Sequence, residues 1–70
     1  MIEYVAKSLG NGWWGLYRRD ANSKSYVYEI SRITFTECFT VEDLIETIKR
    51  YFTPKEEPTI ITKNEVRFLV

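Results

Sequence analysis

Residues 13–17 read WWGLY, a run in which every position except Gly15 carries a large apolar or aromatic side chain. Side chains alternate between the two faces of a β-strand, so an apolar run on successive residues indicates a strand covered on both sides. A glycine inside a strand marks a bend or bulge, the interpretation we favour, or lets another group approach the backbone closely. The run therefore predicts the central strand, residues 13–19, of a small sheet.

Two further strands are expected on either side of this one. Residues 3–9 precede it across the turn Gly10-Asn11-Gly12, and residues 25 to about 35 follow the polar run 20–24. Such β-branched and aromatic segments between turn sequences are typical of antiparallel strands. Residues 2–9 also fit a helical spacing, but so short a segment without a start signal is a poor helix. We therefore expect a three-stranded antiparallel meander.

The most regular pattern in the chain is helical. Thr40 is the expected N-cap, with Asp43 placed to complete a capping box, and Pro54 should end the helix by about residue 52 or 53. Phe39, just before the cap, is expected to pack on Leu44 as a hydrophobic staple. One apolar stripe then runs along the helix: Val41, Leu44, Ile45, Ile48 and Tyr51 or Phe52. This stripe indicates a helix that lies on a sheet.

The C-terminal segment after Pro58 is rich in β-branched and apolar residues. Residues 59–62 and 66–70 flank the polar residues 63–65, a pattern that fits either a hairpin or one bent strand. The predicted fold class is therefore α+β: a three-stranded antiparallel meander, one amphipathic helix and a C-terminal strand or hairpin. With 70 residues, we expect one domain covering positions 1–70.

The expected loop lengths assign side chains to the two faces of the meander. A five-residue loop at 20–24 pairs Tyr17 with Val27 on the face that also carries Trp13, which we call the second face. Trp14 and Leu16 then lie on the opposite, first face. A three-residue turn at 10–12 adds Val5 and Leu9 to the second face. Both faces would therefore carry large apolar groups.

A single helix can cover only one face of such a sheet. The second face is then either covered by residues 60–70, closing a small barrel or sandwich, or left open as a recognition surface. The size of the chain slightly favours closure, because small domains struggle to bury enough apolar surface. If the second face is open, its exposed aromatic side chains would form a recognition surface, because such residues often anchor protein interfaces.

The amino-acid composition disfavours several classes of function for this chain. Ten Lys and Arg balance ten Asp and Glu, and this zero net charge removes the bulk attraction to nucleic acid or anionic lipid. The absence of His and the single cysteine, Cys38, leave few groups for hydrolysis, metal binding or redox chemistry. We therefore expect no enzyme and no cofactor. The unpaired cysteine and the lack of a targeting or membrane-spanning apolar run predict a cytoplasmic protein with no membrane association.

Two binding hypotheses follow from the aromatic second face. The first is a non-enzymatic protein-binding module, with a homodimer as one form, whose partner-binding residues are Trp13, Tyr17, Arg19 and Val27. The alternative is single-stranded nucleic-acid binding, with bases stacking on Trp or Tyr. Its phosphate-binding patch would comprise Arg18, Arg19, Lys24 and Arg32. Zero net charge disfavours this alternative, because phosphate contacts usually supply much of the affinity.

In outline, a three-stranded meander followed by a helix resembles the chromodomain family. The resemblance rests on the segment Glu3-Tyr4-Val5-Ala6 and on the strand 13–17. It implies a small module whose aromatic cage captures a methylated lysine. The strand and cage motifs of that family are not recognisable in this sequence, so neither its ligand nor its site residues are assigned here.

Overall fold

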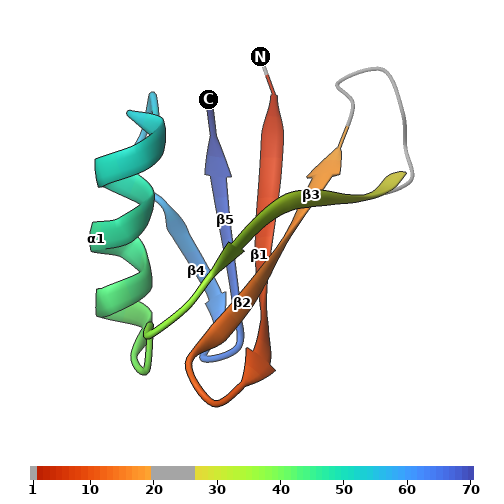
Figure 1. The fold of residues 1–70 in the computed structure, drawn as a ribbon. Coiled ribbons are helices and arrows are strands. Elements are labelled where there is room, and N and C mark those ends of the chain that lie inside the picture. The colour runs from red at the N-terminus through yellow and green to blue at the C-terminus, as the bar shows by residue number, and fades with distance from the viewer. Residues whose placement is uncertain (1, 20–26) are drawn as a thin grey trace.

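The computed structural model of the chain describes residues 2–19 and 27–70, with the backbone alone described at residues 19 and 27–33. These residues form the predicted α+β fold, with residues 3–10 as a strand and the C-terminal segment as a hairpin (Figure 1). The elements in chain order are β1 (Glu3–Gly10), β2 (Trp13–Arg19), β3 (Val27–Phe35), α1 (Val41–Phe52), β4 (Thr59–Thr62) and β5 (Glu65–Leu69).

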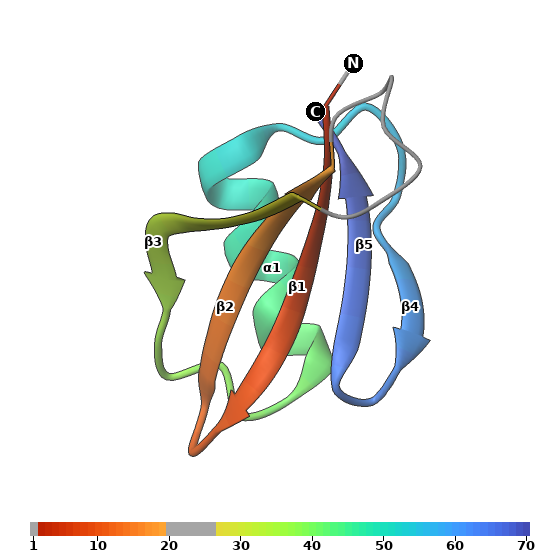
Figure 2. The same ribbon diagram turned by 90° about the vertical axis from the view of Figure 1, so that its right-hand side faces the viewer.

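The strands form one five-stranded antiparallel sheet in the order β3-β2-β1-β5-β4. The C-terminal hairpin adds to the outer edge of β1, where Ala6 lies opposite Val66, and so extends the sheet sideways (Figure 2). The expectation that residues 60–70 fold across the second face is therefore wrong. Pairing with β1 satisfies backbone groups that an open edge would leave without a strand partner.

The pairing of β2 with β3 differs from the expected register. Val27 lies opposite Arg18, and Tyr17 lies opposite Ile30, so the predicted Tyr17–Val27 pair is wrong. The register shifts twice, between Gly15 and Tyr17 and again between Tyr17 and Arg18. Counting back from a loop assumes an unbroken ladder, whereas each of these shifts places two extra residues on β3. The strand β3 accordingly crosses β2 at a steep angle in Figure 1.

The helix α1 begins and ends as its sequence predicts. The Asp43 N–H donates to Thr40 Oγ1 at 3.1 Å and the Thr40 N–H donates to Asp43 Oδ2 at 3.3 Å, which completes the capping box. The C-cap residue Thr53 is left-handed, with φ of 45°, directly before Pro54. Within the described residues, no helix has the length and apolar character needed to cross a bilayer.

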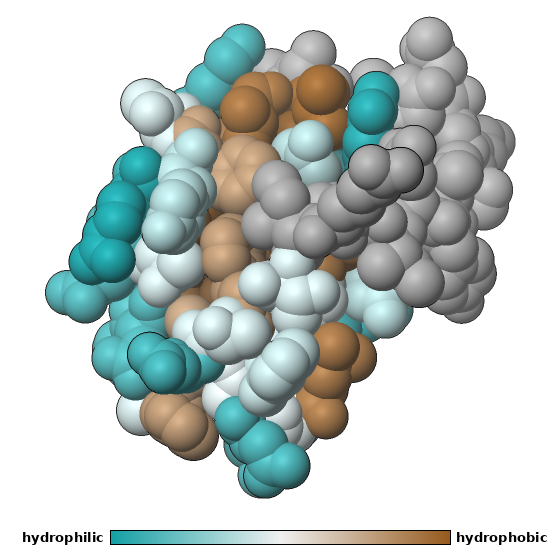
Figure 3. All heavy atoms as spheres, viewed as in Figure 1, coloured by the Kyte–Doolittle hydropathy of each residue, from teal (hydrophilic) through white to brown (hydrophobic). Residues whose placement is uncertain are grey.

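The core lies between α1 and the first face of the sheet. Trp14 and Leu16 are buried there, as predicted, together with Phe68 from β5. Leu44 and Ile48 of the helix are fully buried against them. Figure 3 shows this arrangement from the side, with apolar surface between helix and sheet and hydrophilic surface on the outer side of α1. The helix therefore covers one face of the sheet and leaves the second face to other groups.

Candidate binding surface at the β1–β2 hairpin

The two neighbouring indoles have opposite environments. Trp14 is 3% exposed, and its Nε1–H donates to the carbonyl oxygen of Cys38 at 2.8 Å. Trp13, on the second face, is 51% exposed. Because successive residues of β2 point to opposite faces, one indole belongs to the core and the other to the surface.

The second face is less open than its sequence suggests. Val5 is fully buried, and Tyr17 is half-buried with the Lys7 ammonium 5.1 Å from its ring centroid. A Cβ on Gly15 would lie 3.5 Å from Leu9 Cδ1 and 3.7 Å from Tyr17 Cε2, so these side chains approach each other across the glycine. Leu9 is itself 59% exposed. Among the described side chains of this face, the exposed apolar ones are therefore Leu9 and Trp13 at its hairpin end.

Phe39 is a third exposed apolar side chain at the same hairpin. It is 73% exposed, so the expected burial of this ring as a helix staple is wrong. Its ring lies instead beside Gly12 in the β1–β2 turn, where an added Cβ would be only 3.0 Å from Phe39 Cε1. At this lower end of the molecule, Figure 3 shows two apolar patches that are separated by less apolar surface. We call Leu9, Trp13 and Phe39 the hairpin-end surface.

The backbone that carries Phe39 is held firmly. The preceding residue, Cys38, donates its N–H to the carbonyl oxygen of Gly12 at 2.9 Å, and its carbonyl accepts the Trp14 indole N–H. Glu37 has a left-handed φ of 61°, a conformation that costs energy for a residue with a side chain. On its other side, Phe39 adjoins the capped start of α1. These constraints hold the backbone at Phe39, whose ring is itself largely in solvent.

An open groove of about 710 Å³ runs beside Phe39, between the β1–β2 turn, the start of α1 and the β4–β5 turn. Trp14 and Cys38 line it from the core, and Ile60, which is 53% exposed, lines it from β4. The Ser8 N–H donates to the Asn64 carbonyl at 2.9 Å and ties the two turns together. The groove and the hairpin-end surface thus occupy one end of the molecule, built on segments linked by backbone hydrogen bonds.

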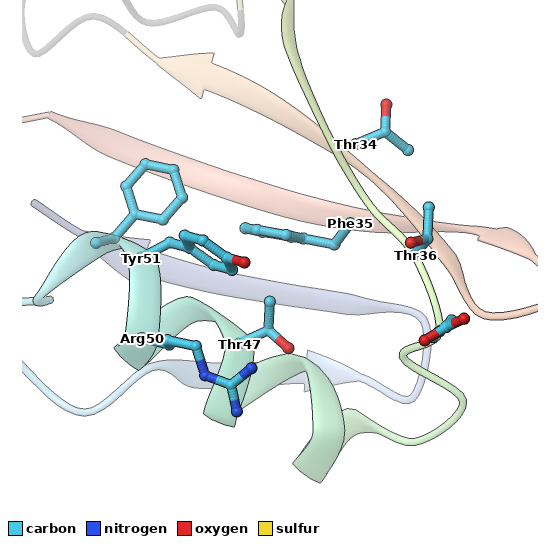
Figure 4. A pocket seen from close by; sticks show the side chains of 8 residues that line it. Thr34, Phe35, Thr36, Thr47, Arg50 and Tyr51 are labelled. Carbon is cyan, nitrogen blue, oxygen red and sulfur yellow. The ribbon is translucent and has the colours of Figure 1, made fainter.

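A second hollow of about 490 Å³ lies between the end of β3 and the helix (Figure 4). Phe35 and Tyr51 stack there with ring centroids 6.3 Å apart, and Arg50 and several threonines line the remainder. It shares no lining residue with the groove beside Phe39. Among the described side chains predicted for partner or nucleic-acid binding, Trp13, Tyr17 and Arg18, none lines it.

The structure brings together only part of the predicted partner-binding set. Trp13 and Tyr17 share the second face, but only Trp13 is largely exposed. Arg19 lies opposite Glu3, and Val27 lies opposite Arg18, each described by its backbone alone. The sequence missed Phe39, because the residue before an N-cap is ordinarily expected to pack on the helix.

Of the predicted nucleic-acid patch, only Arg18 has a described side chain, so the patch as a whole stays a prediction. Arg18 is exposed and lies opposite Tyr4, so by alternation it belongs to the first face, whereas Trp13 belongs to the second. The two residues also lie near opposite ends of β2. Lys24 is outside the described residues, and Arg32 is described by its backbone in β3. The Trp13 ring and the Arg18 guanidinium therefore lie on opposite faces of the sheet.

The described side chains offer little organised chemistry. No group of three His, Cys, Asp or Glu side chains is placed to hold a metal ion in this part of the chain. Cys38 is a free, buried thiol with Sγ 3.5 Å from the Thr36 carbonyl oxygen and 3.5 Å from Thr47 Oγ1.

Comparison with protein families, with curated proteins and with solved structures finds no match for the chain. The outline resemblance to chromodomains thus gains no support from a match.

Proposed function

We propose that the chain is a non-enzymatic protein-binding module whose contact surface is the hairpin-end surface. The observation that carries this proposal is the state of Phe39, a ring 73% exposed on a backbone held by two hydrogen bonds at Cys38. An aromatic residue whose backbone is already held loses less conformational entropy on docking than one in a free segment. Exposed apolar groups at one end of a small protein are typical of an interface.

The expected partner is a protein that offers an apolar segment. Leu9, Trp13 and Phe39 supply the apolar contact area, and Trp in particular is common among the residues that dominate interface energy. The groove beside Phe39 would receive part of that segment. A cytoplasmic setting belongs to the same proposal and is supported by the single free cysteine, which is buried as a thiol.

The proposal is tested by quantitative pull-down from the source cells with the wild-type chain and three folded variants. Trp13→Ala and Phe39→Ala should each lose the same partner, which is then purified and titrated directly. Tyr51→Ala is the matched control, because Tyr51 is 70% exposed on the far part of α1 and should leave binding unchanged. A purified partner bound equally well by all four proteins would contradict the proposal.

A further inference from the structure

The strand β4 ends the described sheet, and no described strand lies along its outer edge (Figure 2). Its four residues, Thr59–Thr62, are all exposed, all β-branched and all uncharged. Edge strands of monomeric proteins usually carry charges or proline that block pairing with another chain. Here Pro58 and Lys63 flank the strand, its register with β5 shifts between Ile60 and Thr62, and Ile60 and Ile61 are 53% and 47% exposed.

The two ends of β4 carry opposite charges. Glu56 and Glu57 precede the strand, and Lys63 follows it. When two antiparallel copies pair about a twofold axis centred on Ile60, Glu57 lies opposite Lys63 of the second copy, and the reverse pair forms at the other end. Glu57 is already bridged to Lys49, with Nζ 2.6 Å from Oε1, so Glu56 adds a second carboxylate beside the incoming lysine. The flanks of β4 are therefore complementary to those of a second copy.

We infer that β4 pairs edge to edge with β4 of a second copy of this chain, extending the sheet across both molecules. Main-chain hydrogen bonds would join the two strands, with Ile60 opposite Ile60 of the second copy at the axis and Ile61 opposite Thr59. The zero net charge of the chain leaves no overall repulsion between copies. A four-residue strand makes a small interface, so the dimer exchanges readily with monomer. The hairpin-end surface is not required for this contact.

The test is sedimentation velocity of the wild-type chain from about 10 µM to about 1 mM, a range that reveals weak dimers. A reversible dimer is expected. Ile61→Lys, which places a charge on the paired edge, should raise the dimer dissociation constant by about tenfold or more. The control is Tyr51→Lys, which places a lysine at another exposed large side chain, 70% accessible on α1, and should leave the constant unchanged.

Charge reversal gives a second readout that does not alter the strand itself. Lys63→Glu should weaken the dimer by about tenfold, and adding Glu56→Lys should restore it, because the flanks become complementary again. Circular dichroism establishes that each variant keeps its fold. A chain that stays monomeric at about 1 mM overturns the inference. A dimer that persists in both Ile61→Lys and Lys63→Glu also overturns it. The same holds if Phe39→Ala abolishes the dimer while Ile61→Lys and Lys63→Glu preserve it.

Discussion

On the first face of the sheet, α1 buries Trp14 among Leu16, Leu44 and Phe68, whereas on the second face Trp13 is half exposed at the hairpin end. The two indoles are adjacent in sequence and belong to the same strand. One contributes to the core and donates a hydrogen bond to Cys38, while the other lies in the hairpin-end surface. The same alternation that builds the core therefore also supplies an exposed aromatic group.

The contrast continues through the segment that joins β3 to α1. The hydrogen bond from the buried Trp14 fixes the carbonyl of Cys38, and Cys38 in turn binds Gly12 of the hairpin. Phe39 follows directly and lies in solvent beside Gly12. The buried face thus positions the exposed ring, so damage to the first face should also disturb the proposed contact surface.

The largest expected effect is that of Trp14→Ala. It removes a buried indole and its hydrogen bond, and should lower the free energy of unfolding by about 3–5 kcal/mol, as for other large-to-small changes in a core. Chemical denaturation followed by circular dichroism measures the loss. A cost below about 1 kcal/mol would mean that the first face is not the core side of β2.

Gly12→Ala should have the next largest effect. Gly12 has φ of 79°, and its new methyl group would meet the Phe39 ring at 3.0 Å, so we expect a loss of about 1–3 kcal/mol with displacement of Phe39. Gly10→Ala is the matched control, because Gly10 has φ of 93° but no atom within 4 Å of its added Cβ. Denaturation of both variants isolates the contact with Phe39. Equal costs would show that the ring does not press on the turn.

Trp13→Ala should change stability by less than about 1 kcal/mol, since half of the residue is already in solvent. The same variant should lose the partner proposed for the hairpin-end surface. Denaturation and partner titration are measured on one protein preparation. A destabilisation as large as that of Trp14→Ala would remove the distinction between the two faces.

The smallest expected effect is that of Gly15→Ala on the second face. The added Cβ would make ordinary contacts of 3.5 Å and 3.7 Å with Leu9 and Tyr17. Because a methyl group restricts the unfolded chain, stability should stay the same or rise by about 0.4–1 kcal/mol. Thermal and chemical denaturation test this. A clear loss of stability would show that the irregular pairing next to Gly15 requires glycine.

Local patterns predicted the elements whose causes are local. Thr40, Asp43 and Pro54 set the ends of α1 through capping and proline sterics, and alternation placed Trp13 and Trp14 on opposite faces. The register of β2 with β3 and the position of the C-terminal hairpin depend on long-range contacts, and no local pattern in the sequence indicates them. Because of the shifts around Tyr17, this residue pairs with Ile30 and not with Val27 as expected. The C-terminal hairpin pairs with the edge of β1 and does not cover the second face.

Phe39 illustrates the same limit within the candidate site. Its position before an N-cap predicted packing on the helix, but the hydrogen bond between Cys38 and Gly12, 26 residues apart in the chain, directs the ring to the hairpin. No property of the local sequence reveals that bond. Trp13, by contrast, was identified from alternation alone, because its exposure depends only on which face the helix covers.

Fluorescence quenching of two single-tryptophan variants tests the central contrast most directly. In Trp14→Phe the remaining Trp13 should emit like a solvated indole and be quenched readily by acrylamide. In Trp13→Phe the remaining Trp14, 3% exposed, should emit at shorter wavelength and resist the quencher. Equal protection of both indoles in a monomeric sample, or readier quenching of Trp14, would contradict this account.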